Sequence, residues 1–115
     1  MKFKTTYIKT LLLISILAVL SNTAFAVEMD GKKIAFDRKK GNCLACHAIG
    51  DGDMPGNIGP PLIIMKQRFP DRAILKAQIW DATVRNSMSI MPPFGKHHIL
   101  SDTEIEKIID YLYTL

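Results

Sequence analysis

The sequence contains two cysteines, and they stand close together in the segment GNCLACH, which ends in a histidine. Cys43 and Cys46 are separated by two residues, and His47 follows directly. On one helical turn, two thiols at this spacing can add to the two vinyl groups of a haem, and the next histidine can reach the iron. The pattern predicts one covalent haem c, with Cys43 and Cys46 as thioether residues and His47 as an axial iron ligand.

Other uses of such a thiol pair are less compatible with the rest of the chain. A disulfide between the two cysteines would close a very small loop and add little stability. A thioredoxin-like redox site requires a βαβ unit, which this sequence does not predict. A zinc site using both cysteines and two of the three histidines, His47, His97 and His98, remains an alternative because it satisfies the tetrahedral ligand count.

A haem iron bound by His47 needs a ligand on its other face. The side chains that could serve are four methionines and two histidines: Met54, Met65, Met88, Met91, His97 and His98. Met91 is favoured because Pro92 and Pro93 stiffen an extended loop from which a thioether can be held against a metal. Met88, in the same loop, is the second choice.

The segment NIGPPL offers a partner for the histidine itself. A prolyl carbonyl can accept the Nδ1 proton of an iron-bound histidine, which fixes the tautomer and strengthens the ligand. Pro60 is the candidate for this contact with His47. The alternative is that Pro60 and Pro61 only prevent helix formation. Trp80 could donate its indole N–H to a haem propionate, or it could be a core side chain.

Three helices separated by loops are predicted to position these residues. The first spans residues 30–40 and is capped by Asp30, and the second spans residues 71–82, with Pro70 at its start. Residues 50–61 and 86–95 are rich in glycine, proline or both, which predicts loops. No segment reads as a strand, so the predicted fold class is all-α.

The last helix has the clearest local signals. Ser101 and Glu104 form a capping box, and Leu100 lies at the position of a hydrophobic staple. The apolar positions that follow have helical spacing and predict a buried stripe: Ile105, Ile108, Ile109 and Leu112.

The first 26 residues have the layout of a secretory signal peptide. Three lysines precede an apolar run, and the small-residue pattern AFA ends at Ala26. This predicts a periplasmic cytochrome domain over residues 27–115; an uncleaved membrane anchor is the alternative.

The charge of the mature domain limits its partners. Without the three leader lysines, the formal net charge of +4 falls to +1. That balance, with no basic run interleaved with aromatic residues, argues against a nucleic-acid partner, and no membrane association is expected after cleavage.

Together these motifs resemble class I cytochrome c across the mature chain. More narrowly, the segments AFDRKKGNCLACHAI, MPGNIGPPL and IMPPFGKHHILSDTEIEKIIDYLYTL resemble the SoxX family, the monohaem cytochrome subunits of SoxAX complexes. The resemblance implies Cys43 and Cys46 as thioether residues and His47 and Met91 as axial ligands. It also implies a SoxA-like cytochrome subunit and the SoxYZ carrier of thiosulfate as partners. An electron-transfer chain of this kind also needs a downstream electron acceptor.

The expected function is therefore electron transfer within a SoxAX-type complex, with no catalytic residue in this chain alone. Two other classes remain open: a freestanding electron shuttle to a terminal oxidase, and a zinc-stabilised interaction module. A haem sensor or peroxidase would need one labile axial position on the iron.

Overall fold

The computed structural model describes residues 30–115, so the predicted signal peptide and its cleavage site lie outside the described residues. A helical segment over residues 30–36 comes first. It is followed by η1 (Cys43–Ala45), α2 (Met65–Arg68), α3 (Arg72–Trp80), η2 (Ala82–Val84) and α4 (Asp102–Leu112). Within the described range no strand forms, and a single parallel bridge joins Ile49 to Leu62. The prediction of an all-α fold is confirmed.

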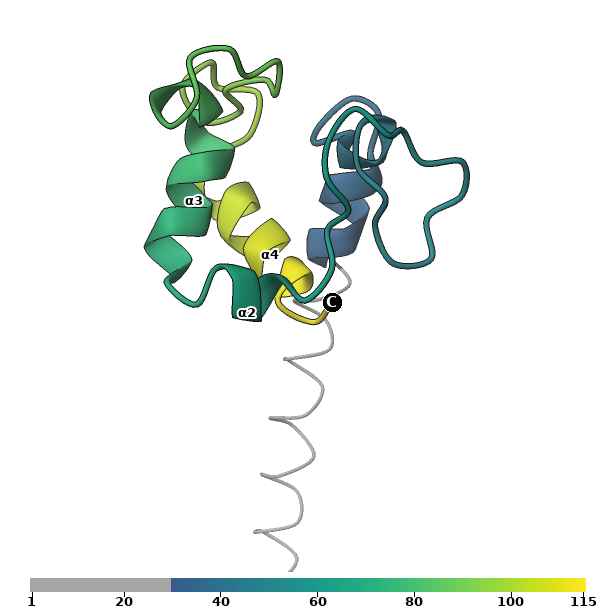
Figure 1. Cartoon of the computed structure of the whole chain (residues 1–115). Helices are drawn as coiled ribbons and strands as arrows, with labels where there is room; N and C mark the ends of the chain where they lie inside the picture. Colours follow the sequence, from purple (N-terminus) through teal and green to yellow (C-terminus); the bar gives the residue numbers. More distant parts are fainter. Residues whose placement is uncertain (1–29) are drawn as a thin grey trace, which may run out of the picture.

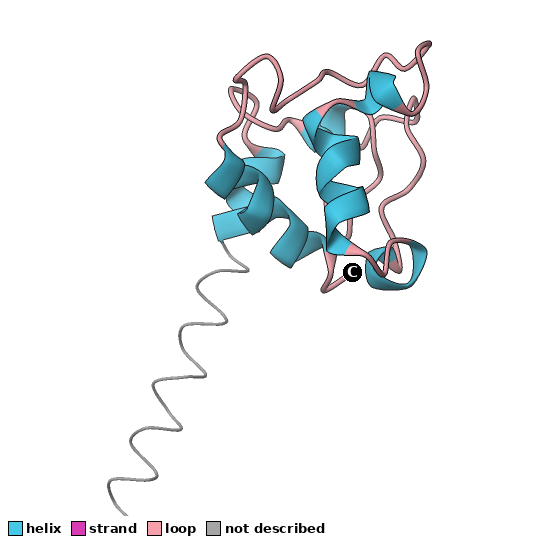
Figure 2. Ribbon diagram, turned by 90° about the vertical axis from the view of Figure 1, so that its left-hand side faces the viewer, coloured by secondary structure: helices cyan, strands magenta, loops and turns pink. Residues whose placement is uncertain are grey.

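Helix α4 lies between the other two long helical segments (Figure 1). On one side it packs against α3, and on the other the Phe36 ring meets Tyr111 edge to face, with 6.3 Å between ring centroids. Figure 1 shows the turn around η1 and the loop between η2 and α4 at the same end of these helices, and Figure 2 shows that loops, with no strand, connect the helices of the described range. The fold therefore brings the cysteine pair and the loop that carries Met88 and Met91 to one end of the molecule. We call this loop, residues 86–95, the methionine loop. No helix within residues 30–115 has the length and apolar character needed to cross a membrane.

The sequence signals of α4 are confirmed in detail. The Ser101 hydroxyl accepts from the Glu104 N–H at 3.2 Å, and the Glu104 carboxylate accepts from the Ser101 N–H at 2.9 Å. This capping box satisfies two backbone donors that a helix start leaves without partners. The predicted stripe is buried, together with the staple residue: Leu100, Ile105, Ile108, Ile109 and Leu112. These side chains form the centre of the core.

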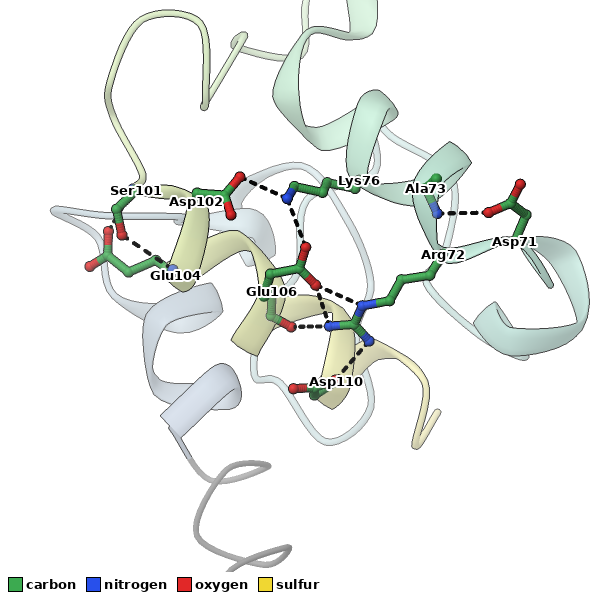
Figure 3. A network of polar contacts seen from close by, with 9 residues as sticks. All are labelled: Asp71, Arg72, Ala73, Lys76, Ser101, Asp102, Glu104, Glu106 and Asp110. Carbon is green, nitrogen blue, oxygen red and sulfur yellow. Dashed lines mark hydrogen bonds and ion pairs between the residues drawn. The ribbon is translucent and has the colours of Figure 1, made fainter.

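Polar contacts tie α3 across α4 (Figure 3). The Arg72 guanidinium donates to the Glu106 carboxylate and to Asp110, both at 2.7 Å. Lys76 pairs with Asp102 at 2.7 Å and with Glu106 at 2.8 Å. Because these groups are partly exposed, each pair contributes little stability by itself, and the network mainly fixes how the two helices cross.

The first helix is shorter than predicted. It ends at residue 36 instead of Lys40, because Asp37 makes contacts that compete with the helix. Its side chain accepts from the Lys39 N–H at 2.8 Å, and its carbonyl accepts from the N–H groups of Lys40 and Asn42. The prediction of Asp30 as the cap is also wrong: Asp30 is already helical, and its carboxylate pairs with Lys107.

The second helix begins as predicted and ends earlier. The Asp71 side chain caps α3 by accepting from the Ala73 N–H at 2.8 Å. The helix ends at Trp80 instead of Ala82, because Asp81 turns to an extended conformation and its side chain caps η2. The short helix α2 was not predicted; it follows Ile64, which has a left-handed φ of 45° with no sequence signal for it.

Candidate haem-binding site

The cysteine pair lies on a tight turn. Asn42 has a left-handed conformation and precedes the 3₁₀ turn η1, after which the N–H groups of Cys46 and His47 both donate to the Cys43 carbonyl, at 3.1 and 2.9 Å. Cys43 and Cys46 are both free thiols and are partly buried. The two thiols and the imidazole are therefore carried by one compact turn, as covalent attachment of a haem requires.

Cys43 lies in apolar surroundings. Its side chain packs against the hydrophobic core, and burial raises the pKa of the thiol to about 11. The neutral thiol is therefore favoured over the thiolate in this fold.

His47 is held by the loop that the sequence analysis singled out. Its Nδ1 lies 2.7 Å from the carbonyl oxygen of Pro60. A carbonyl oxygen can only accept, so Nδ1 carries the proton in the neutral ring and Nε2 keeps its lone pair. This is the tautomer that can bind a metal through Nε2.

Gly59 packs directly against the face of the His47 ring. A Cβ atom at residue 59 would lie 2.3 Å from Cε1 and 2.5 Å from Nδ1 of that ring, so only glycine fits. The Gly59 N–H also donates to the Cys46 carbonyl at 2.8 Å. The loop therefore fixes the imidazole from its face as well as from its edge. Sequence reasoning missed Gly59, although its place in GPP beside the predicted partner Pro60 was a usable signal.

Further hydrogen bonds anchor the same loop to the cysteine turn and to α2. The Gly56 N–H donates to the Leu44 carbonyl at 2.9 Å, and the Leu62 N–H donates to the Ala48 carbonyl at 2.8 Å. The Arg68 guanidinium, which sequence reasoning also missed, donates to the Pro61 carbonyl at 2.7 Å. These contacts hold the peptide unit next to Pro60 and thereby support its contact with the histidine.

The two methionines of the predicted ligand loop differ in their surroundings. Met91 is partly buried and packs against the hydrophobic core, whereas Met88 is 83% exposed. Met65 is 2% exposed within the core, and Met54 lies on the surface. The burial pattern favours Met91 among the candidates, and His97 and His98 are exposed.

The structure does not assemble the zinc alternative. Within residues 30–115, no three side chains of His, Cys, Asp or Glu gather in a way that could hold a metal ion. The cysteines and the exposed His97 and His98 are thus not brought together as a ligand set.

Four isoleucines that lie within a few residues of Gly59 or Met91 in the sequence are exposed: Ile58, Ile63, Ile64 and Ile90. A haem is largely apolar and would cover side chains of this kind. Together with the contacts of His47 and the compact cysteine turn, these side chains fit a covalently attached haem.

One of the two roles predicted for Trp80, that of a core side chain, is wrong. Trp80 is 38% exposed, so it is not a core side chain, and its ring packs against Gly95 in the methionine loop. Its suggested hydrogen bond to a haem propionate stays a prediction.

An all-α fold with this cysteine-histidine turn and a carbonyl-bound histidine defines a c-type cytochrome. The chain belongs to the cytochrome c family, because the sequence model described as "Cytochrome C oxidase, cbb3-type, subunit III" matches residues 29–112. It is also 38% identical over 77 residues to an "Uncharacterized lipoprotein" of Aquifex aeolicus. That match covers 65% of this chain and 37% of the relative, so the chain spans little more than a third of the relative's length. Membership of this family implies haem c and electron transfer.

Proposed function

We propose that this chain is a monohaem cytochrome c in which His47 and Met91 bind the iron and Cys43 and Cys46 hold the porphyrin. The observation that carries the proposal is the 2.7 Å contact between Nδ1 of His47 and the Pro60 carbonyl. This contact leaves Nε2 as the metal-binding atom and fixes the plane of the ring. The burial of Met91 supports it as the second ligand.

The chain's own residues prepare this site for electron transfer. When bound, the haem supplies a centre that gains and loses one electron. Gly59 and Pro60 hold the imidazole in a single orientation, and Met91 would supply the second ligand to the iron. With two protein ligands, the iron would have no position open to a substrate.

We further propose that the chain acts as the electron-transfer subunit of a SoxAX-type complex. Joining the outer sulfur of thiosulfate to a cysteine thiol of SoxYZ forms one S–S bond and releases one proton and two electrons. A single haem holds one electron, so this chain accepts them one at a time and passes each to an oxidised downstream acceptor. The S–S bond itself forms on the SoxA-like partner. The motifs quoted for SoxX support this assignment.

The family description favours a second candidate. Its name refers to a subunit of a cytochrome c oxidase. A freestanding or oxidase-bound carrier would use the same His47 and Met91 ligands and would need no SoxA-like subunit.

We propose that the protein works in the periplasm. The predicted signal peptide supports export, and so does the printed name of the lipoprotein relative, since lipoproteins are exported. The family match supports it as well, because covalent haem c attachment is typical of exported proteins.

A visible spectrum of protein matured in a haem-competent host tests the proposed site. We expect a pyridine haemochrome of the two-thioether type and pigment that remains with the protein in acidified acetone. Met91→Ala should abolish the charge-transfer band of sulfur bound to ferric iron, and Met88→Ala should leave it unchanged. A colourless product, or a band that is lost in the Met88 variant instead, would contradict the ligand assignment.

Co-purification distinguishes the two candidate functions. A SoxAX subunit should elute with its SoxA-like partner, and the complex should reduce its haem when thiosulfate and SoxYZ are added. A shuttle should elute alone and be oxidised rapidly by membranes that contain a terminal oxidase. Elution alone, with no reduction by thiosulfate, would overturn the SoxAX proposal.

A further inference from the structure

We propose that Asp81 is a positioning residue for the iron ligand Met91: by holding Lys96, it closes the base of the methionine loop and keeps that ligand in place. This inference rests on the proposed function, because it takes Met91 to be the axial ligand. Asp81 itself touches neither the haem nor the ligand.

Among the described residues, Asp81 is the one charged residue that is buried, and its side chain is 7% exposed. Its carboxylate accepts from the Thr83 N–H and hydroxyl and from the Lys96 ammonium at 2.7 Å. The Lys96 contact lowers the pKa of the carboxyl to about 2, so the ion pair is intact at neutral pH. A buried carboxylate needs such partners, and removing one leaves an uncompensated charge.

The backbone closes the loop at the same place. The Trp80 carbonyl accepts from the N–H groups of Gly95 and Lys96, each at 3.2 Å. At residue 95 the Trp80 ring leaves no room for a side chain, since a Cβ there would lie 2.1 Å from Cε3. At the other end of the loop, the Asn86 N–H donates to the Ala82 carbonyl at 3.1 Å. Residues 80–82 thus hold both ends of the loop.

The tip of the loop has weaker anchors than its base. The hydrogen bonds that the structure shows there join residues of the loop itself: Met88 N–H to the Asn86 side chain at 3.0 Å, Ser89 N–H to the Asn86 carbonyl at 2.9 Å, and Met91 N–H to the Ser89 hydroxyl at 3.3 Å. Met88 and Ile90 are exposed on either side. The side chains of Met91 and Phe94 pack against the core, and the base that Asp81 closes is the polar anchor that holds this loop.

This arrangement predicts a measurable opening equilibrium. An external ligand such as imidazole binds ferric iron only when the loop has opened and Met91 has left. Its apparent affinity therefore equals the intrinsic affinity multiplied by the open fraction. Weakening the base should raise that fraction and tighten imidazole binding without any change at the iron.

The test is imidazole titration of the haem-loaded ferric protein, followed by loss of the sulfur charge-transfer band. Asp81→Asn keeps the size of the side chain and removes its charge; we expect imidazole to bind about tenfold more tightly through a larger open fraction. Lys96→Gln should give a similar change, and the double variant little more, because both remove the same ion pair. Asp81→Glu, which retains the charge, should bind imidazole less tightly than Asp81→Asn.

A matched control is Asp30→Asn, which breaks the ion pair of Asp30 with Lys107 at 3.1 Å on the first helix. It should leave imidazole affinity unchanged. Amide hydrogen exchange gives an independent measurement: Gly95 and Lys96 should exchange faster in Asp81→Asn and not in the control.

The possible failures are distinguishable. Wild-type protein without a sulfur band, or Met91→Ala with the band intact, would overturn the proposed ligand and this inference with it. A band that depends on Met91, combined with wild-type imidazole affinity in both Asp81→Asn and Lys96→Gln, overturns this inference alone. Because Lys96 is largely exposed, Lys96→Gln decides the question if the Asp81 variant does not fold.

Discussion

Substituting Gly59 by alanine most directly tests how Gly59 and Pro60 hold the His47 ring. The new Cβ would lie 2.3 Å from Cε1 of His47, about 1.1 Å closer than the 3.4 Å at which ordinary contact begins. Either the ring or the loop must move by about 1 Å, which misaligns the 2.7 Å contact between Nδ1 and the Pro60 carbonyl and weakens it. Overpacking costs about 1–3 kcal/mol, and the weakened hydrogen bond adds up to about 1 kcal/mol.

Urea unfolding of the haem-loaded protein measures this loss. We expect the midpoint of Gly59→Ala to fall by about 1–3 M. The reduction potential should rise, because a histidine that donates less well to a carbonyl is a weaker electron donor to the iron. Met54→Ala, which shortens a 93% exposed side chain in the same loop without adding an atom near His47, is the control and should change neither value by much. If Gly59→Ala kept both the midpoint and the potential of the wild type, Gly59 would not fix the orientation of the His47 ring.

Three further predictions concern the scaffold. Ser101→Ala removes the side-chain half of the α4 capping box and should lower the free energy of unfolding by about 1 kcal/mol, measured as a lower Tm. Arg72→Ala breaks the partly exposed ties to Glu106 and Asp110 and should cost about 1 kcal/mol, a difference that shrinks in high salt; equal loss at all salt concentrations would contradict its electrostatic origin. The pKa of Asp81, lowered to about 2 in the folded protein from about 3.9 when unfolded, means that its stabilisation is present above about pH 4 and is lost as the pH falls toward 2. An acid titration should therefore show a smaller loss of stability in this window for Asp81→Asn than for the wild type.

Helix positions were predictable where local signals determine them. The capping box of Ser101 and Glu104 and the apolar stripe behind it are local patterns, so α4 was predicted closely. The end of the first helix was not, because Asp37 can either continue a helix or fold back on its own backbone, and tertiary context decides. Helix α2 depends on the left-handed backbone of Ile64, which no residue type indicates.

The candidate site was predictable in its chemistry and less so in its supports. The spacing of Cys43, Cys46 and His47 specifies the cofactor class because the chemistry requires it. Pro60 was singled out because a carbonyl in a proline-stiffened loop suits a histidine partner, and the two do lie together. The pair of Asp81 and Lys96 joins residues 15 apart through a turn whose path only the fold defines, so sequence spacing gave no indication of it.

The contacts between the first helix and α4 also constrain how the protein matures. Asp30 and Lys107 are 77 residues apart in the chain, and Lys40 and Glu104 are 64 apart, yet each pair meets in the folded protein. Closing so large a loop is entropically costly and slow, and it must wait until α4 has emerged. Until the first helix and α4 meet, the core against which Cys43 packs is incomplete, so this thiol is more exposed in the partly folded chain than in the folded domain.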